Sequence, residues 1–403
     1  MKNKFLFLLV LGLLSVARGP LHAEGGWDNG FYLKSADGQF SMNIGGRLQF
    51  EEQIDKRKGN QSVATNAANR ARVTENADNF QNSFRIRRAR IQTTGTIYEK
   101  LDWFTILNVG TAGGTADPTT TWFAGFTYNF VPTFRMSGGM VQLPLDRQAE
   151  LSSAWFLTIE PPITATQKDG TKGRTIARDS LGMPFDLGIR ADGDLGSHVS
   201  YSAGLGNGSG FNNLNANNGL SYGGSFQFDV WDKVPAGKET DFEHSENPKL
   251  AFNLGAGIED ENVPDENVAG VARTGDWLAS AGTAFRWMGF ALNSELYYRI
   301  IKFAGTSVED TNRDNKLRDV GYYTNVGYYF IPKKLEGVLT ASQIVREGPD
   351  NNANEFGGGL NWYLHGNNVK LQLNYINFLD YDEIPGLNNA TFHRVRAMFS
   401  MFM

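Results

Sequence analysis

Apolar and polar residues alternate along most of this chain in short segments. FSMNIGGRLQF at residues 40–50 places its apolar side chains on one face and Ser, Asn, Arg and Gln on the other. Residues 220–230 and 369–379 repeat this two-residue period. Such a period is typical of β-strands that have one apolar and one polar face. The pattern therefore predicts an all-β protein.

Sixteen segments of the chain show this pattern, with turn-forming residues between them. The expected strands are residues 39–50, 84–98, 101–110, 120–130, 133–141, 184–192, 198–206, 220–231, 248–258, 276–286, 289–301, 319–330, 336–346, 355–363, 369–379 and 390–402. An even number of antiparallel strands can close into a barrel without an unpaired edge.

The connections between these segments alternate between short and long. The short ones contain turn formers such as Pro132, Gly289, Pro332 and Gly366. The long ones are residues 51–83, 111–119, 142–183, 207–219, 259–275, 302–318, 347–354 and 380–389. Residues 232–247 stand in the place of a short connection but are longer than that class predicts. This layout predicts a transmembrane antiparallel β-barrel with short periplasmic turns and long extracellular loops, whereas a soluble sandwich has no reason to keep it.

Both ends of the chain agree with export to an outer membrane. Lys2 and Lys4 precede a short apolar run that ends before Ala23, so residues 1–23 are expected to be a signal peptide and residues 24–403 the barrel. The final strand alternates apolar and polar residues, as outer-membrane assembly machinery requires. We therefore expect the protein in the outer membrane of a Gram-negative-type bacterium.

Composition narrows the class further. The chain has no cysteine, so an exported protein of this size is held together without disulfides. After the first residues, no stretch approaches the ~18 consecutive apolar residues that a transmembrane helix needs. The formal net charge is −5.

Against this acidic balance, FRIRRARIQTTGTI at residues 84–97 carries four arginines on one expected strand. Alternation places Arg88 and Arg90 on the face opposite Ala89 and Ile91. Because an arginine at the bilayer midplane on the lipid face costs about 2–4 kcal/mol, these two are expected to face the lumen. The same alternation places Arg85 and Arg87 outward, near the loop end, where long side chains can reach the headgroups.

Applied to every expected strand, alternation gives an inventory of lumenal charges. The basic side chains are Arg47, Arg88, Arg90, Arg135, Arg190, Lys249, Arg286, Arg299, Lys370, Arg394 and Arg396. The acidic side chains are Asp186, Asp192, Asp229 and Glu295. Because the last strand must pair with the first to close the barrel, we expect one wall to carry Arg47, Arg88, Arg90, Arg394 and Arg396. Such a patch attracts anions and suits phosphate-like groups.

The sequence resembles the phosphate-selective porin O and P family. The resemblance rests on F-x-x-R-R-x-R from Phe84 to Arg90, with Gly95 and then Leu101-Asp102, and on GMVQLPLDRQAELSSAWFLTIE at 139–160. Weaker similarity is found in ARDSLGMPFDLGI at 177–189 and LGNGSGFNN at 205–213. The likeness in motif lies mainly within residues 84–213.

This resemblance implies a sixteen-stranded barrel, a homotrimer, and an inward-folded constriction loop at residues 142–183. The basic residues of that loop are Arg147, Lys168, Lys172, Arg174 and Arg178. Its acidic residues are Asp146, Glu150, Glu160, Asp169 and Asp179, so the loop is nearly neutral.

We therefore expect an outer-membrane porin, a passive diffusion channel whose lumen favours small anions such as phosphate or polyphosphate. The alternatives are a general porin without anion specificity, or a surface adhesin or structural barrel whose long loops bind a partner. Residues 310–319 have an incomplete calcium-loop spacing, and no serine–histidine arrangement suggests an enzyme. We expect no metal, cofactor or nucleic acid, and contact with outer-membrane lipid and lipopolysaccharide.

Overall fold

The protein was studied as a computed structural model that describes most of the chain. The described residues are 23–27, 30–58, 60–63, 73–76, 79–111, 118–164, 181–183, 185–208, 215, 219–264, 272–304, 314–347, 352–379 and 391–403. The expected signal peptide lies outside them except for Ala23.

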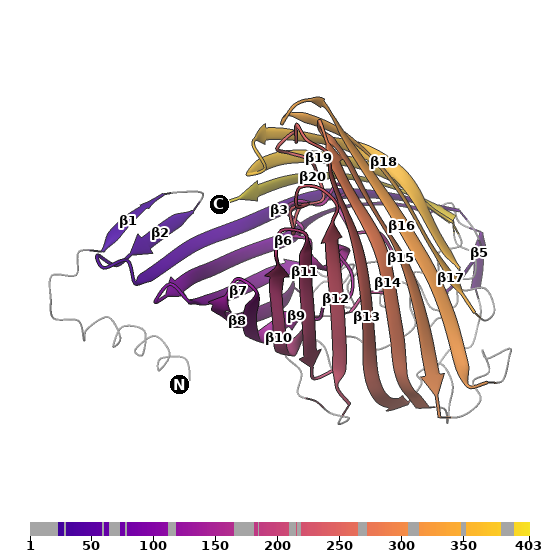
Figure 1. Ribbon diagram of the computed structural model, residues 1–403. Coiled ribbons are helices and arrows are strands. Elements are labelled where there is room, and N and C mark those ends of the chain that lie inside the picture. The colour runs from indigo at the N-terminus through magenta and orange to yellow at the C-terminus, as the bar shows by residue number, and fades with distance from the viewer. Residues whose placement is uncertain are drawn as a thin grey trace, which may run out of the picture.

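Sixteen strands of the described residues close into one antiparallel barrel (Figure 1). They are β3 (Phe40–Lys58), β6 (Asn79–Ile97), β7 (Leu101–Thr111), β8 (Pro118–Val131), β9 (Phe134–Gln142), β10 (Phe185–Leu195), β11 (Val199–Gly206), β12 (Ser221–Asp229), β13 (Lys249–Pro264), β14 (Ala272–Trp287), β15 (Phe290–Phe303), β16 (Lys316–Ile331), β17 (Leu335–Arg346), β18 (Ala353–His365), β19 (Val369–Leu379) and β20 (Thr391–Phe402). Closure is made by β20, which pairs with β3 from Phe402 opposite Arg47 to Thr391 opposite Lys58.

The predicted fold class is confirmed, and each expected strand overlaps one strand of the barrel. Several strands are longer than expected at the end that carries the long loops. β3 continues to Lys58 rather than residue 50, and β13 continues to Pro264 rather than residue 258. Alternation of apolar and polar residues is required only where one face meets lipid, so the pattern stops before the backbone pairing does.

A hairpin of β1 (Glu24–Trp27) and β2 (Phe31–Lys34) was not among the expected strands. β2 pairs with the first residues of β3, with Phe31 opposite Ile44. β20 ends beside this point, because Met403 and Gly46 exchange two backbone hydrogen bonds of 2.9 Å. The hairpin therefore continues the wall beside β3 where β20 stops. Two further short strands, β4 (Asn60–Val63) and β5 (Val73–Asn76), pair with each other in the first long loop.

The apolar core lies inside the barrel. Its buried side chains come from the inward faces of the strands and from two connections that fold inward. Those of the connections include Leu143, Leu145, Leu157, Ile159, Ile163, Leu181, Met183 and Val234. The outer face exposes a band of large apolar side chains, such as Leu254, Phe226 and Leu339. This arrangement inverts that of a soluble protein and suits a wall surrounded by lipid. No helix among the described residues is long and apolar enough to cross a membrane.

Candidate functional site

All four arginines of FRIRRAR point into the barrel, because β6 contains a bulge. Gln49 of β3 is opposite Arg88, whereas the next residue, Phe50, is opposite Ile86, so Arg87 is an additional residue in the ladder. A bulge reverses the alternation beyond it. Phe84 and Ile86 lie on the outer face with exposed fractions of 64% and 48%. The prediction that Arg85 and Arg87 face outward is therefore wrong.

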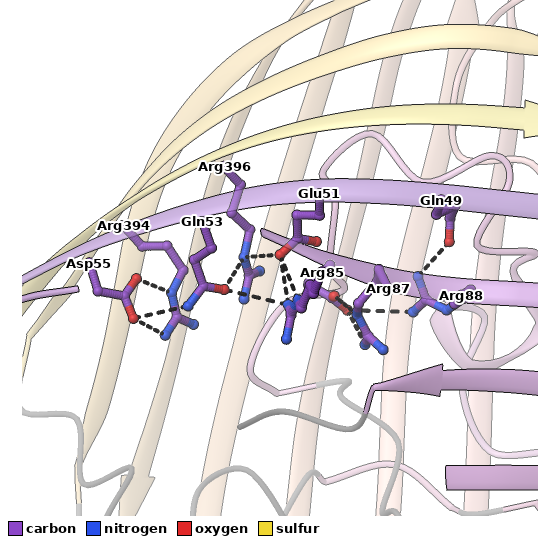
Figure 2. A network of polar contacts seen from close by, with 10 residues as sticks. Gln49, Glu51, Gln53, Asp55, Arg85, Arg87, Arg88, Arg394 and Arg396 are labelled. Carbon is purple, nitrogen blue, oxygen red and sulfur yellow. Dashed lines mark hydrogen bonds and ion pairs between the residues drawn. The ribbon is translucent and has the colours of Figure 1, made fainter. Parts of the chain in front are cut away.

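These side chains join others to form one row along the wall made by β20, β3 and β6 (Figure 2). We call this the arginine row, and its members are Arg47, Arg85, Arg87, Arg88, Arg90, Arg394 and Arg396. All five arginines that the sequence placed on one wall belong to it. Along β3 the row extends from Arg47 to Asp55, which is about 27 Å at ~3.4 Å per residue.

At the loop end of the row, the arginines pair with carboxylates of β3. Arg394 donates two hydrogen bonds to Asp55, with Nε–Oδ1 at 2.7 Å and Nη2–Oδ2 at 2.8 Å. Arg85 Nη2 lies 2.7 Å from Glu51 Oε1, and Arg396 Nε lies 3.4 Å from the same oxygen. One carboxylate therefore serves two guanidinium groups at this level.

In the middle of the row, the partner comes from the connection between β9 and β10. Glu160 accepts hydrogen bonds from Arg87 Nε and from Arg87 Nη2, the second at 3.0 Å. Arg88 Nη2 lies 3.5 Å from Glu160 Oε2, and Arg88 Nη1 donates to Gln49 at 2.9 Å. Burial alone would raise the pKa of Glu160, but the charges of Arg87 and Arg88 outweigh it and hold that pKa well below its usual range.

At the turn end of the row, Arg47 and Arg90 lie directly opposite each other on β3 and β6. Arg47 donates to the hydroxyl groups of Ser153 and Ser152, the latter at 3.4 Å. Neither arginine has a carboxylate partner among the described residues, and the Nε atoms of both are buried without a hydrogen bond. Within the described part of the chain, the two positive charges at this level of the row are therefore uncompensated.

The connection between β9 and β10 crosses the lumen. Residues 143–164, which we call the inner loop, are held by inward side chains of distant strands. Ser280 donates to Leu145 O at 2.7 Å, and Ile159 N donates to Asn374 Oδ1 at 2.7 Å. Lys370 donates to Ala154 O at 2.7 Å. The inner loop is therefore bound along much of its length to the wall of the barrel.

Arg147 anchors the inner loop by its backbone and its side chain. Its backbone N donates to Glu295 Oε1 at 2.6 Å, and its guanidinium donates to Gln227 at 2.8 Å and to Pro235 O at 2.6 Å. It is 6% exposed, so it offers little surface to a solute. Beside it, burial and the charge of Glu295 raise the pKa of Asp146 well above its usual value. The other basic residues expected on this loop, Lys168, Lys172, Arg174 and Arg178, lie outside the described residues.

A second connection also enters the barrel, and only its unusual length distinguishes it in the sequence. Residues 230–248, which we call the inner turn, pack against the inner loop. Glu239 accepts from Leu157 N at 2.7 Å and from Asn325 Nδ2 at 2.6 Å. The ring of Phe242 lies 5.6 Å from that of Trp155, between ring centroids. The inner loop is thus held between the barrel wall and the inner turn.

On the wall formed by β9 to β12, a cavity of about 310 Å³ lies beside the inner turn. Three of its four cationic side chains, those of Arg135, Arg190 and Lys233, are paired with carboxylates, and the fourth is that of Arg147. Arg135 Nη2 lies 2.6 Å from Asp192, and Arg190 Nη2 lies 2.8 Å from Glu150 of the inner loop. Lys233 pairs with Asp194, with its Nζ 2.5 Å from Oδ1. Charge is therefore balanced here, in contrast to the arginine row.

The inventory of lumenal charges taken from the sequence omitted many acids. The additional inward carboxylates in the described strands include Glu51, Asp55, Glu259, Asp276, Asp319, Glu336 and Glu355. The expected excess of eleven basic over four acidic side chains is therefore wrong for the lumen as a whole. Glu51 and Asp55 could have been found by continuing the alternation of Arg47 and Gln49 past residue 50. The others lie at the first residue of an expected strand, as Asp276 and Asp319 do, or just past its last residue, as Glu259 does, where alternation is least informative.

The described residues contain no cluster of three or more side chains suited to a metal ion. Residues 310–313 of the calcium-like stretch at 310–319 lie outside them, and Asp314 forms an ion pair with Arg318.

The closed barrel, its apolar outer face and its charged lumen define the class as an outer-membrane channel. The chain matches the family described as phosphate-selective porin O and P over residues 60–401, and it belongs to that family. The protein is accordingly placed in the outer membrane of a Gram-negative bacterium.

Solved structures with the same fold are distant in sequence. The barrel is similar to the outer membrane channel DcaP of Acinetobacter baumannii, with a TM-score of 0.55, 12% identity, and 92% of this chain and 99% of that chain covered. It is also similar to a trimer form of OmpT of Vibrio cholerae, with a TM-score of 0.53, 8% identity, and 90% and 99% covered. The loop L8 deletion mutant of OmpT gives a TM-score of 0.55 at 10% identity, with 90% and 99% covered. No curated protein matches the chain significantly.

Proposed function

We propose that this channel is a passive diffusion pore that favours anions, with the arginine row as its selective element. The observation that carries the proposal is the imbalance of charge within the row. Among the described residues, three carboxylates, those of Glu51, Asp55 and Glu160, form ion pairs with members of the row, which has seven arginines. Fixed positive charge in a narrow aqueous lumen raises the local concentration of anions and lowers that of cations.

The geometry of the row suits stepwise passage. Arginines follow one another along β3 and its neighbours, so an anion that leaves one guanidinium meets the next. Conduction requires sites that bind strongly enough to replace hydration and weakly enough to release. The carboxylates and amides between the arginines, such as Glu51 and Gln53, weaken each site and so support release. The pair of Arg47 and Arg90 is the strongest candidate for a contact with the solute itself.

The inner loop is the proposed constriction of the pore. It contacts the arginine row through Ser152, Ser153 and Glu160 and is bound to β14 on the opposite wall through Leu145. An anion would pass between this loop and the part of the wall formed by β3, β6 and the following strands. The basic residues Lys168, Lys172 and Arg174, further along the same connection, would add positive charge to this constriction.

The solute proposed is a small anion, with phosphate or polyphosphate as candidates because the family is described by phosphate selectivity. A general pore with mild anion preference is the second candidate. This second candidate is supported by the charge balance around Arg135 and Arg190, where no excess of positive charge selects anions over cations. By analogy with the trimer form of OmpT, we propose a homotrimer surrounded by lipid and lipopolysaccharide.

The experiment that tests the proposal is the zero-current potential across a planar bilayer that contains the purified channel in a KCl gradient. We expect the sign that corresponds to chloride preference, and partial block of chloride current by millimolar phosphate. The double variant Arg47→Ala and Arg90→Ala should lose most of the preference. Arg135→Ala, which removes a cation from the balanced region, is the matched control and should change it little. Cation preference in the wild type would refute the proposal, and absence of any conductance would favour the adhesin or structural barrel.

A further inference from the structure

Glu160 is bound to the arginine row in the manner of a ligand. Both of its carboxylate oxygens accept hydrogen bonds from Arg87, through Nε and Nη2, and Arg88 Nη2 lies 3.5 Å from Oε2. Two parallel hydrogen bonds from one guanidinium are also how arginine binds a free carboxylate or phosphate. The donors of Arg87 that would receive a solute are therefore already in use.

The backbone that carries Glu160 is held on both sides. Ile159 N donates to Asn374 of β19 at 2.7 Å, and Ile163 N donates to Glu355 of β18 at 3.1 Å. Pro161 and Pro162 restrict the backbone between them. The carboxylate is thus delivered to Arg87 by a fixed support, and only its own side chain needs to turn for the site to open.

The pair also remains in reach of water. The side chains of Arg87 and Glu160 are 25% and 20% exposed, whereas those of the ion pair between Arg299 and Asp319 in the wall are both 0% exposed. A wholly buried pair is structural. A pair that borders the lumen can exchange its carboxylate for another oxyanion.

From these three observations we infer that Arg87 and Arg88 form an oxyanion-binding site that Glu160 occupies as a tethered competitor. A permeating phosphate or carboxylate enters by displacing the Glu160 side chain, which returns when the solute leaves. The tether lowers the affinity of the site and shortens the residence of the solute. Chloride offers a single acceptor atom, which matches the two parallel donors of a guanidinium less well than two oxygens do, so the competition acts mainly on oxyanions. This inference rests on the proposed anion pathway.

The test is the concentration of inorganic phosphate that halves the chloride current through single channels in a planar bilayer. Glu160→Gln keeps the shape of the side chain and removes its charge. We expect it to lower the half-blocking concentration about ten-fold, because one fixed negative charge at contact distance is removed. Glu160→Asp keeps the charge on a shorter side chain that cannot reach both donors, and we expect a smaller shift in the same direction.

The control is Glu150→Gln, which removes a carboxylate of the same inner loop that pairs with Arg190 on the other wall. We expect its half-blocking concentration to stay within about two-fold of the wild type. Equal shifts in the two glutamine variants would show an effect of net charge alone and would overturn the inference. No shift in Glu160→Gln, or in Glu160→Asp if the first variant does not assemble, would also overturn it.

The outcomes separate this inference from the proposed function. A wild-type channel without anion preference refutes the anion pathway itself. A wild-type channel with anion preference and an unchanged Glu160→Gln variant refutes only the tethered competitor.

Discussion

At the scale of single residues, the lumen combines two kinds of ion pair. The pair of Arg87 with Glu160 in the arginine row borders water, whereas Asp319 lies fully buried between two arginines of the neighbouring strands. Arg299 Nε lies 3.1 Å from its Oδ2, and Arg346 Nη1 lies 3.9 Å from the same atom. A buried pair contributes little net stability, but removal of one partner leaves an uncompensated charge.

We therefore predict that Asp319→Asn lowers the free energy of unfolding by about 3–5 kcal/mol. Urea-induced unfolding from lipid vesicles measures this quantity. Asp232→Asn, at an exposed position of the inner turn, is the control and should stay within about 0.5 kcal/mol. Equal stability of Asp319→Asn and wild type would mean that water reaches this group.

Asp146 gives the protein a dependence of stability on pH. Burial and the charge of Glu295 raise its pKa well above the usual value in the folded state. A raised pKa means that the folded protein binds this proton more tightly, so the contribution is fully present below the unfolded pKa of ~3.9 and is lost as pH rises through the folded value.

The expected result is that Asp146→Asn loses less stability than the wild type when pH is raised from 5 to 9. The comparison is made by unfolding in urea at each pH. Parallel pH profiles of the two proteins would show that Asp146 is ionised in both states.

At the scale of elements, alternation predicted the strands but could not detect the bulge in β6. Arg85, Arg87 and Arg88 have the same side chain, so no change of residue type marks the point where an extra residue enters. Alternation placed Arg88 and Arg90 correctly because Ala89 and Ile91 between them are apolar. The ion pair of Arg87 with Glu160 joins residues 73 positions apart, and no local pattern contains such a contact.

The bulge predicts the accessibility of three adjacent positions. Because the chain has no cysteine, single cysteine variants give an unambiguous signal. Arg85→Cys and Arg87→Cys should react with a membrane-impermeant charged thiol reagent in reconstituted channels, and Ile86→Cys should not. Labelling is measured by mass spectrometry. Reaction of Ile86→Cys but not of Arg85→Cys would contradict the bulge and would support the regular strand that alternation in the sequence predicts.

The inner turn is the second element that the sequence did not place. Its length was visible, but its position depends on Phe242, whose ring lies 5.3 Å from that of Tyr363 and 5.6 Å from that of Trp155, between centroids. These partners come from β18 and the inner loop, so the contact is an outcome of barrel closure. Local alternation contains no information about it.

We predict that Phe242→Ala loosens the inner loop and makes single-channel current noisier, with a higher mean conductance. Loss of an aromatic side chain from packed surroundings typically costs about 3–5 kcal/mol, here confined to the attachment of the turn. Phe252→Ala, on the exposed face of β13, is the control and should conduct as the wild type. A quiet, unchanged current in Phe242→Ala would show that the strands alone hold the loop.

At the scale of the whole molecule, charge is distributed unevenly. The chain is acidic and the lumen contains many carboxylates, yet the arginine row keeps a local excess of positive charge that ends at the balanced region around Arg135. The arginine row acts on permeating ions through its electrostatic field in the water of the lumen. Mobile ions screen that field over about 10 Å at 0.1 M salt and about 3 Å at 1 M.

We accordingly expect anion preference to weaken as salt concentration rises at a constant gradient ratio. Zero-current potentials measured around 0.1 M and around 1 M KCl test this, with the Arg47→Ala and Arg90→Ala variant as the comparison. The two proteins should converge at high salt. Undiminished selectivity at 1 M would point to exclusion by size or by direct contact.

The bulge at Arg87 has a consequence at the level of the gene. Because Arg87 is the additional residue of β6, loss of its codon would leave a regular strand in which Arg88, Ile86 and Arg85 keep their present faces. Loss of the Ile86 codon instead would leave Arg87 next in the alternation after Arg88 and turn it toward lipid. The two adjacent three-nucleotide deletions should therefore differ sharply in outcome. The protein without Arg87 should still assemble in the membrane, and the protein without Ile86 should assemble poorly. An alignment of relatives that lack one residue here should place the gap at Arg87.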